Sequence, residues 1–121
     1  MLFRSHAFHS PLVEPILKDF EKTADSISFK PPQLRLISNV TGELAMGEVV
    51  TKASYWRDHI RQPVQFARGV ESLLALNVDV LLEVGPSPTL LGMTQRIPGA
   101  DEKPSAPTLR QGRDEIGRAH V

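Results

Sequence analysis

The chain has 121 residues, 40% of them hydrophobic and 23% charged, which is typical of one small globular domain or a part of a larger one. Its 14 Lys and Arg balance its 14 Asp and Glu, so no basic surplus favours nucleic acid or an anionic membrane as a partner. The chain has no cysteine, which excludes disulfides, thiolate catalysis and cysteine-based metal sites. Since no apolar run approaches the roughly 20 residues that span a bilayer, we expect a cytoplasmic protein.

The N-terminal segment places two histidines and a phenylalanine directly ahead of a predicted helix. Residues 5–10 have the sequence SHAFHS, and Ser10 followed by proline is typical of a helix cap and first helical position. Apolar residues then recur at helical spacing, which predicts a helix over residues 11–25 that Pro15 bends in its first turns. A titratable loop at a helix start is a suitable place for an acid–base group, and His9 is the candidate.

The rest of the pattern predicts an α/β fold with parallel strands. Residues 34–40 have strand character and end at a Thr-Gly turn, and a nearly continuous apolar run predicts a second strand, covered on both faces, at 78–84. The apolar spacing predicts helices at 53–60, at 64–76 and, after a Gly-Pro-Ser-Pro turn, at 88–97. With the first helix this makes about four helices, and the order of elements favours a right-handed parallel βαβ unit.

The C-terminal residues differ in character from those before them. Gly, Pro, Ser and charged residues dominate 99–114, which predicts a solvated linker after a domain that covers residues 1–98. The last residues, 115–121, continue no pattern and resemble the read-through translation of a common sequencing-library adapter. We interpret them as a non-native tail and exclude them from the fold.

The residues alone leave several interpretations of the histidines open. His9 is a general base with an accessible ring, or a loop histidine that hydrogen-bonds nearby backbone, or a metal ligand together with His6 and His59. A metal site is disfavoured because no acidic residue or further histidine has the usual helical ligand spacing, so we predict no metal. The chain contains no G-x-S-x-G pentapeptide, the common setting of a nucleophilic serine.

Four blocks of sequence together resemble a known family. They are residues 5–15 (SHAFHSPLVEP), 39–44 (NVTGEL), 55–64 (YWRDHIRQPV) and 82–86 (LEVGP). In this order they resemble the acyltransferase domains of modular type I polyketide synthases from the histidine box onward, and 108–114 resembles the segment just past that domain. The resemblance covers residues 4–114 and implies the C-terminal part of an acyltransferase domain with an α/β-hydrolase-like fold.

The resemblance implies ping-pong transfer of a malonyl extender unit from coenzyme A, through a serine, to the thiol of an acyl carrier protein. His9 is similar to the base that activates this serine, and the backbone carbonyl of His59 matches the group that orients the base. His6 and Phe8 belong to the box that selects the extender unit. Members with His-Ala-Phe-His usually select malonyl, because the bulky Phe8 fills the space of an α-methyl group.

The resemblance also indicates which parts of the machinery these residues do not match. The family's serine, its substrate-carboxylate arginine and its oxyanion partners lie upstream of the matching blocks, so we expect these 121 residues alone to be inactive. No cofactor is expected. The implied partners are malonyl-CoA, a carrier protein with its phosphopantetheine arm and the neighbouring synthase domains, with no nucleic acid and no membrane. The alternative is a non-catalytic interaction or scaffold module that keeps the fold.

Overall fold

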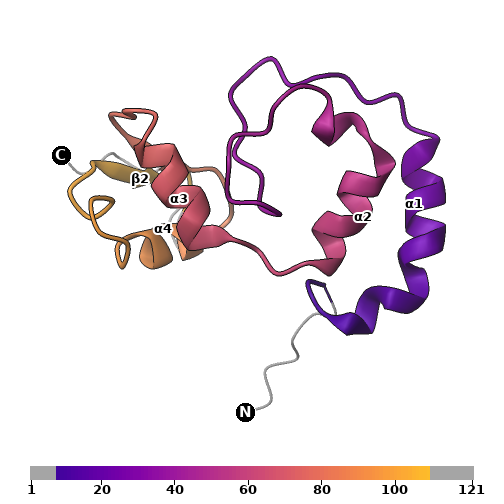
Figure 1. The fold of residues 1–121 in the computed structure, drawn as a ribbon. Coiled ribbons are helices and arrows are strands. Elements are labelled where there is room, and N and C mark those ends of the chain that lie inside the picture. The colour runs from indigo at the N-terminus through magenta and orange to yellow at the C-terminus, as the bar shows by residue number, and fades with distance from the viewer. Residues whose placement is uncertain (1–7, 110–121) are drawn as a thin grey trace, which may run out of the picture. The chain divides into compact units, whose positions relative to one another are not determined.

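The computed structural model describes residues 8–109, so His6, the end of the predicted linker and the predicted tail lie outside the described residues. The chain forms two compact units, Met1–Gly69 and Val70–Val121. The elements in Figure 1 are η1 (Pro11–Ile16), α1 (Leu17–Asp25), η2 (Val49–Thr51), α2 (Ala53–Arg61), α3 (Phe66–Leu74), β1 (Leu81–Glu83), α4 (Thr89–Thr94) and β2 (Ser105–Pro107). Within the described residues, four α-helices and a parallel two-stranded sheet confirm the predicted α/β class. No helix in this part of the chain is long and apolar enough to cross a bilayer.

The N-terminal helical segment begins where the sequence predicts, but it consists of a 3-10 helix followed by an α-helix. Ser10 caps it by accepting a hydrogen bond from the Leu12 N–H at 3.3 Å. The first part, η1, is a 3-10 helix, and α-helical geometry starts only at Leu17. Pro15 explains the change, because it has no N–H for an α-helical hydrogen bond and its ring crowds the carbonyl one turn earlier.

Helices α1 and α2 pack side by side in the first unit (Figure 1). Ala24 of α1 and Ala53 of α2 are buried. Trp56 of α2 stacks on Phe29 with their ring centroids 5.8 Å apart, and its Nε1–H donates to the Val50 carbonyl oxygen at 2.9 Å. These contacts hold α2 in place, and the C-terminal end of α2 carries the candidate site.

The prediction of a strand at 34–40 is wrong. The chain instead folds back on itself, with an isolated antiparallel bridge between Ile37 and Leu44. The Gly42 N–H donates to the Ser38 carbonyl oxygen at 2.7 Å, and Gly42 has a φ of 72°, which favours glycine. This tight turn brings the segment against its own continuation, so it is not available as a strand of the parallel sheet.

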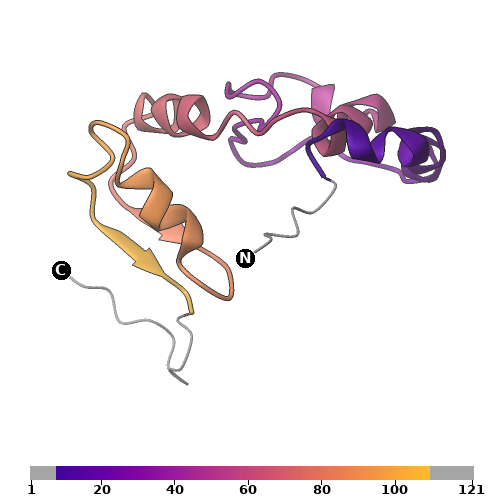
Figure 2. The ribbon, with the colours of Figure 1, turned by 90° about the horizontal axis from the view of Figure 1, so that it is seen from below.

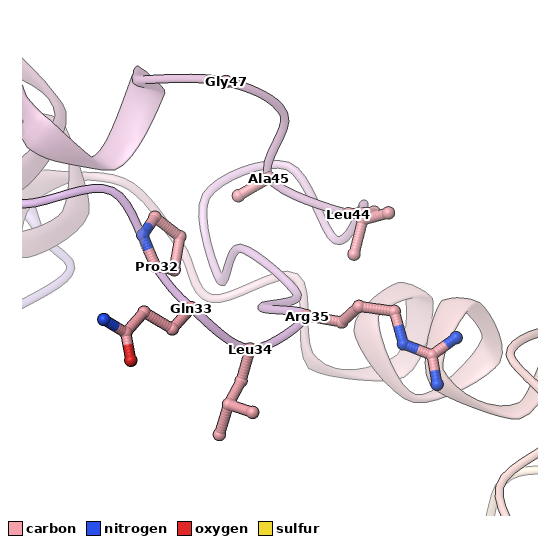
Figure 3. A pocket seen from close by; sticks show the side chains of 7 residues that line it. All are labelled: Pro32, Gln33, Leu34, Arg35, Leu44, Ala45 and Gly47. Atoms are coloured by element: carbon pink, nitrogen blue, oxygen red, sulfur yellow. The ribbon is translucent and has the colours of Figure 1, made fainter.

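A shallow cleft lies beside this loop (Figure 3). Its volume is about 390 Å³, and it is lined by Pro32, Gln33, Leu34, Arg35, Leu44, Ala45 and Gly47. Leu34 is 85% exposed, and Figure 3 shows its side chain pointing away from Leu44. The lining residues include no histidine and no carboxylate, so the cleft offers no acid–base group.

In the second unit, β1, α4 and β2 form a parallel βαβ arrangement (Figure 2). Strand β1 lies within the predicted strand at 78–84. The Glu83 carboxylate accepts hydrogen bonds from the N–H groups of Leu90 at 3.0 Å and Leu91 at 2.8 Å. These bonds satisfy backbone donors in the first turn of α4, which have no partners inside the helix.

The partner of β1 differs from the prediction. The sequence predicts a parallel strand at 34–40, but β1 pairs with β2, which lies in the segment predicted as a linker, 99–114. In the register of this pair Leu82 is opposite Ala106. The structure therefore differs from the linker expectation at β2, and the boundary of the domain itself stays a prediction.

Candidate active site

The candidate site is the loop at residues 8–10, which contacts the C-terminal end of α2. The His9 N–H donates to the carbonyl oxygen of Ile60 at 2.7 Å. The ring nitrogen Nδ1 of His9 lies 2.9 Å from the carbonyl oxygen of Gln62, 53 residues further along the chain. The end of α2 thus fixes both the main chain and the imidazole ring of His9.

Pro63 explains why these carbonyl groups are available. The last carbonyls of a helix have no partners within it, and α2 ends at Arg61. Gln62 has an extended backbone with φ −78° and ψ 151°, the conformation that a residue before proline favours. Pro63 has no N–H with which to continue the helix. The carbonyl oxygens of Ile60 and Gln62 therefore accept from His9 instead.

The contact with Gln62 decides which ring nitrogen of His9 carries a proton. A carbonyl oxygen only accepts hydrogen bonds, so the neutral imidazole that makes this bond has its proton on Nδ1. The lone pair of Nε2 is then free, which is the form in which an imidazole acts as a general base. The arrangement can therefore take up a proton at one defined atom.

The backbone of His9 is in an uncommon conformation. Its φ of 62° lies in the left-handed region, which residues other than glycine rarely adopt and which Asn, Asp and His tolerate best. Such a conformation persists only where surrounding contacts hold it, and it is found more often at functional sites. The bonds to Ile60 and Gln62 provide these contacts on one side, and the Ser10 cap provides them on the other.

The structure gives His59 a different role from the predicted one. The resemblance assigns its backbone carbonyl to orienting His9, but the carbonyl at the His9 ring belongs to Gln62, so this assignment is wrong. The reason is geometric: His59 lies inside α2, where carbonyls run along the helix axis, whereas Gln62 lies just past its end. The His59 ring does lie beside the site, 5.8 Å from the His9 ring between centroids, in an edge-on arrangement.

Aromatic rings and an amide surround the His59 side chain. Its ring lies 6.1 Å from that of Tyr55 and 5.6 Å from that of Trp56, between centroids, and Asn39 Nδ2 is 3.4 Å from its Nε2. Burial lowers the pKa of His59 below its usual value of 6.5, and the nearby His9 lowers it further. His59 is therefore neutral at pH 7 and gives His9 an uncharged neighbour.

Comparison with known proteins shows the family to which the chain belongs. Residues 4–116 match the acyl transferase domain family. The chain belongs to this family. It is 40% identical over 117 residues to the spectinabilin polyketide synthase system protein NorB of Streptomyces orinoci, and the match covers 93% of this chain and 5% of NorB.

Solved structures show the same acyl transferase fold. The acyltransferase domain from the second module of the salinomycin polyketide synthase matches with a TM-score of 0.84 at 38% identity, over 94% of this chain and 26% of that chain. A complex of a holo type II acyl-carrier protein with its malonyl-transacylase matches with a TM-score of 0.77 at 25% identity, over 91% of this chain and 35% of that chain. This acyl transferase chain therefore spans about a quarter of the salinomycin domain.

The remaining predicted site residues of this acyl transferase chain are only partly described. Phe8 directly precedes His9, and it is 56% exposed. His6, the other predicted selectivity residue, lies outside the described residues. Among residues 8–109, no group of three or more His, Cys, Asp or Glu lies close enough together to hold a metal ion.

Two residues of this site have no signal in the side-chain pattern. Ile60 and Gln62 act through backbone carbonyls, which any residue carries. The usable signal is Pro63, because a proline shortly after a predicted helix indicates unpaired carbonyls at its end. Asn39 lies in a block that resembles the family, but its contact with His59 joins segments that the sequence does not place together.

The lowered pKa of His59 predicts a specific pH dependence of stability. Between the lower folded pKa and the unfolded value of 6.5, the unfolded chain binds more protons, so the free energy of unfolding falls as the pH is lowered through this range. In His59→Gln this contribution is absent, and we expect a shallower decrease between about pH 7.5 and pH 5. Denaturation followed by the fluorescence of Trp56, the single tryptophan, measures both curves. Parallel curves for the two proteins would contradict the prediction.

Proposed function

We propose that this chain supplies the general base of an acyl transferase that moves a malonyl group from coenzyme A to the thiol of an acyl carrier protein in polyketide biosynthesis. The observation that carries the proposal is the 2.9 Å contact between His9 Nδ1 and the Gln62 carbonyl oxygen, which leaves Nε2 free to take a proton. Membership of the acyl transferase domain family supports acyl transfer as the class of reaction.

The base serves a serine that these 121 residues do not hold in a G-x-S-x-G setting. As the serine oxygen attacks the thioester carbonyl, Nε2 of His9 takes the hydroxyl proton. When the tetrahedral intermediate expels the coenzyme A sulfur, that sulfur receives the proton. The carrier thiol then gives its proton to Nε2 and attacks the acyl-serine, and the serine oxygen regains a proton as it leaves. The reaction needs no redox step and no resident cofactor.

The relatives support the choice of substrate and partners. NorB is a polyketide synthase system protein, and the solved complex holds a carrier protein with its malonyl-transacylase. We therefore take malonyl-CoA as the donor and the phosphopantetheine thiol of a carrier protein as the acceptor. The neighbouring synthase domains are the further partners.

A domain graft tests the proposal. Residues 4–116 of this chain replace the matching segment of the salinomycin acyltransferase domain, which supplies the rest of the fold. We expect this grafted domain to form a malonyl-enzyme from malonyl-CoA and to pass the group to a carrier protein, as seen by intact-protein mass spectrometry. The malonyl-transacylase of the solved carrier-protein complex is the positive control for malonyl loading and transfer. A folded graft that forms no acyl-enzyme would contradict catalysis and favour a non-catalytic interaction module.

Phe8, in the same sequence box as His6, is the residue that we propose selects malonyl by filling the space of an α-methyl group. In the grafted domain, Phe8→Ser is expected to reduce the preference for malonyl-CoA over methylmalonyl-CoA by about tenfold, because one methyl group is worth roughly 1–3 kcal/mol of discrimination. A competition at equal concentrations, with the two acyl-enzymes quantified by mass, measures the ratio. Leu12→Ser is the matched control, since Leu12 is also exposed and lies outside the box. An unchanged ratio in Phe8→Ser would contradict the steric explanation.

A further inference from the structure

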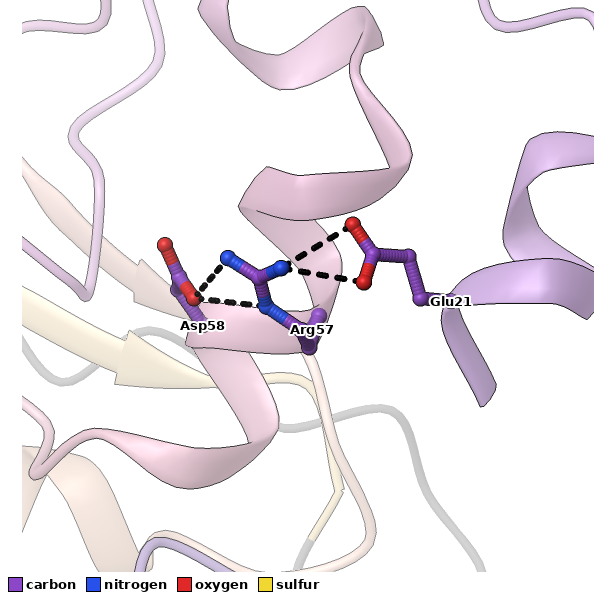
Figure 4. Close-up of polar contacts among 3 residues, drawn as sticks. All are labelled: Glu21, Arg57 and Asp58. Atoms are coloured by element: carbon purple, nitrogen blue, oxygen red, sulfur yellow. Dashed lines mark hydrogen bonds and ion pairs between the residues drawn. The ribbon is translucent and has the colours of Figure 1, made fainter. Parts of the chain in front are cut away.

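Among residues 8–109, two ion pairs connect the N-terminal helical segment to α2. Arg61 donates from Nε to Glu14 Oε1 at 2.9 Å, and its Nη2 lies 2.8 Å from the same oxygen. Arg57 pairs with Glu21 at 2.9 Å and also holds Asp58 (Figure 4). The first pair joins η1 to the last residue of α2, and the second joins α1 to the interior of α2.

Arg61 stands between the two residues whose carbonyls hold His9. Ile60 precedes it and Gln62 follows it, so a displacement of the Arg61 backbone moves both acceptors. Glu14 lies on η1, shortly after His9 in the chain. The Glu14–Arg61 pair therefore closes a ring of contacts: the His9 loop meets the end of α2 through backbone groups, and η1 meets the same end through side chains. The Arg61 side chain is 28% exposed and that of Glu14 is 56% exposed, so the pair lies at the surface, with Arg61 as its more buried member.

The left-handed backbone conformation of His9 depends on this ring of contacts. A residue with a φ of 62° depends on the contacts around it, and release of η1 allows the loop to relax toward an ordinary conformation. The ring then moves away from the Gln62 carbonyl, and no contact favours a proton on Nδ1 over one on Nε2. We propose that Glu14 and Arg61 are positioning residues that hold His9 in the tautomer with a free Nε2. This inference rests on the proposed role of His9 as the base.

Charge reversal in the grafted domain tests the pair. Glu14→Arg and Arg61→Glu are each expected to lower kcat for acyl-enzyme formation by roughly three- to tenfold, with the KM for malonyl-CoA unchanged. The double reversal is expected to restore kcat to within about twofold, because opposite charges again face each other. Glu21→Arg is the matched control: it breaks the other ion pair between the same segments, and kcat should not change.

The tautomer of His9 gives a readout that does not depend on activity. With ¹⁵N-labelled histidine, in the 121-residue chain and in the grafted domain, the Nδ1-protonated form of His9 should dominate. It should decrease in Glu14→Arg and return in the double reversal. Glu14→Gln, which removes the charge without reversing it, should give a smaller decrease and serves where a reversed variant does not fold.

Several results would overturn the proposal. A loss of kcat that the double reversal does not rescue, or an equal loss in Glu21→Arg, would show that the Glu14–Arg61 pair supports the stability of the fold and does not position His9. An unchanged His9 tautomer in folded Glu14→Arg or Glu14→Gln would do the same. If His9 proves dispensable for loading, the proposed function fails, but the tautomer still tests the positioning. The two failures are therefore distinguishable.

Discussion

In the grafted domain, His9→Ala is expected to lower the rate of acyl-enzyme formation by about 10²- to 10⁴-fold, the contribution of a well-placed general base. The reason is that Nε2 of His9 is the atom that the contact with Gln62 leaves free to take the serine proton. His59 is a poor substitute, because its own Nε2 faces the amide of Asn39. Stopped-flow measurement of coenzyme A release gives the rate directly.

The backbone conformation of His9 calls for a second, matched variant. Alanine at a φ of 62° is strained, whereas asparagine tolerates the left-handed region and has no basic ring nitrogen. If the imidazole is the base, His9→Asn and His9→Ala show the same loss. Near-normal loading in His9→Asn would show that His9 acts through the shape of its loop and would remove it from the proton transfer.

The 121-residue chain by itself is expected to form no acyl-enzyme and to transfer no malonyl group. A nucleophilic serine needs an exposed hydroxyl on a sharp turn, commonly between the glycines of G-x-S-x-G. Ser38 is 3% exposed and bonds the Tyr55 hydroxyl at 2.9 Å, and Ser87 lies 3.1 Å from the Thr89 hydroxyl. Neither serine has both flanking glycines: Ser38 has none, and Ser87 follows Gly85 but has Thr89 at the position of the second glycine.

This second prediction needs only the chain, malonyl-CoA and a carrier protein that bears its phosphopantetheine arm. Mass spectrometry of both proteins after incubation is expected to show no malonyl adduct on either. The grafted domain at the same concentration is the positive control. Malonyl transfer catalysed by the chain alone would contradict the prediction, and the modified residue would identify a nucleophile that the structure does not suggest.

The helices could be predicted because each has its own apolar spacing and its own boundary signals. The predicted helix at 53–60 is observed as Ala53–Arg61, since the aromatic residues of α2 pack inward and Pro63 prevents its continuation. Strand β1 lies within the predicted strand at 78–84, but the pairing of the strands could not be predicted, because a strand requires a partner. Residues 34–40 have suitable residue types, but the turn at Gly42 folds them onto their own continuation. Strand β2, with the sequence Ser-Ala-Pro, has no strand pattern and pairs through its backbone.

In the candidate site, the two histidines could be predicted as site residues, whereas the residues that act through backbone groups could not. The histidine-bearing loop and His59 lie together, as the sequence resemblance implies for parts of one site, and the role of His9 as base stays a prediction. The resemblance points to the carbonyl of His59, three positions before that of Gln62, because a backbone carbonyl has no side-chain signature. The Glu14–Arg61 pair joins positions that only the packing of η1 on α2 brings together.

Chemical rescue tests the central claim most directly. The grafted domain with His9→Ala lacks the ring, and free imidazole added to the solution can occupy the space and take the serine proton. If His9 is the base, the rate of acyl-enzyme formation rises in proportion to the concentration of unprotonated imidazole, while the unaltered graft does not respond. A folded His9→Ala variant whose rate stays flat across the imidazole series would contradict the assignment of His9 as the general base.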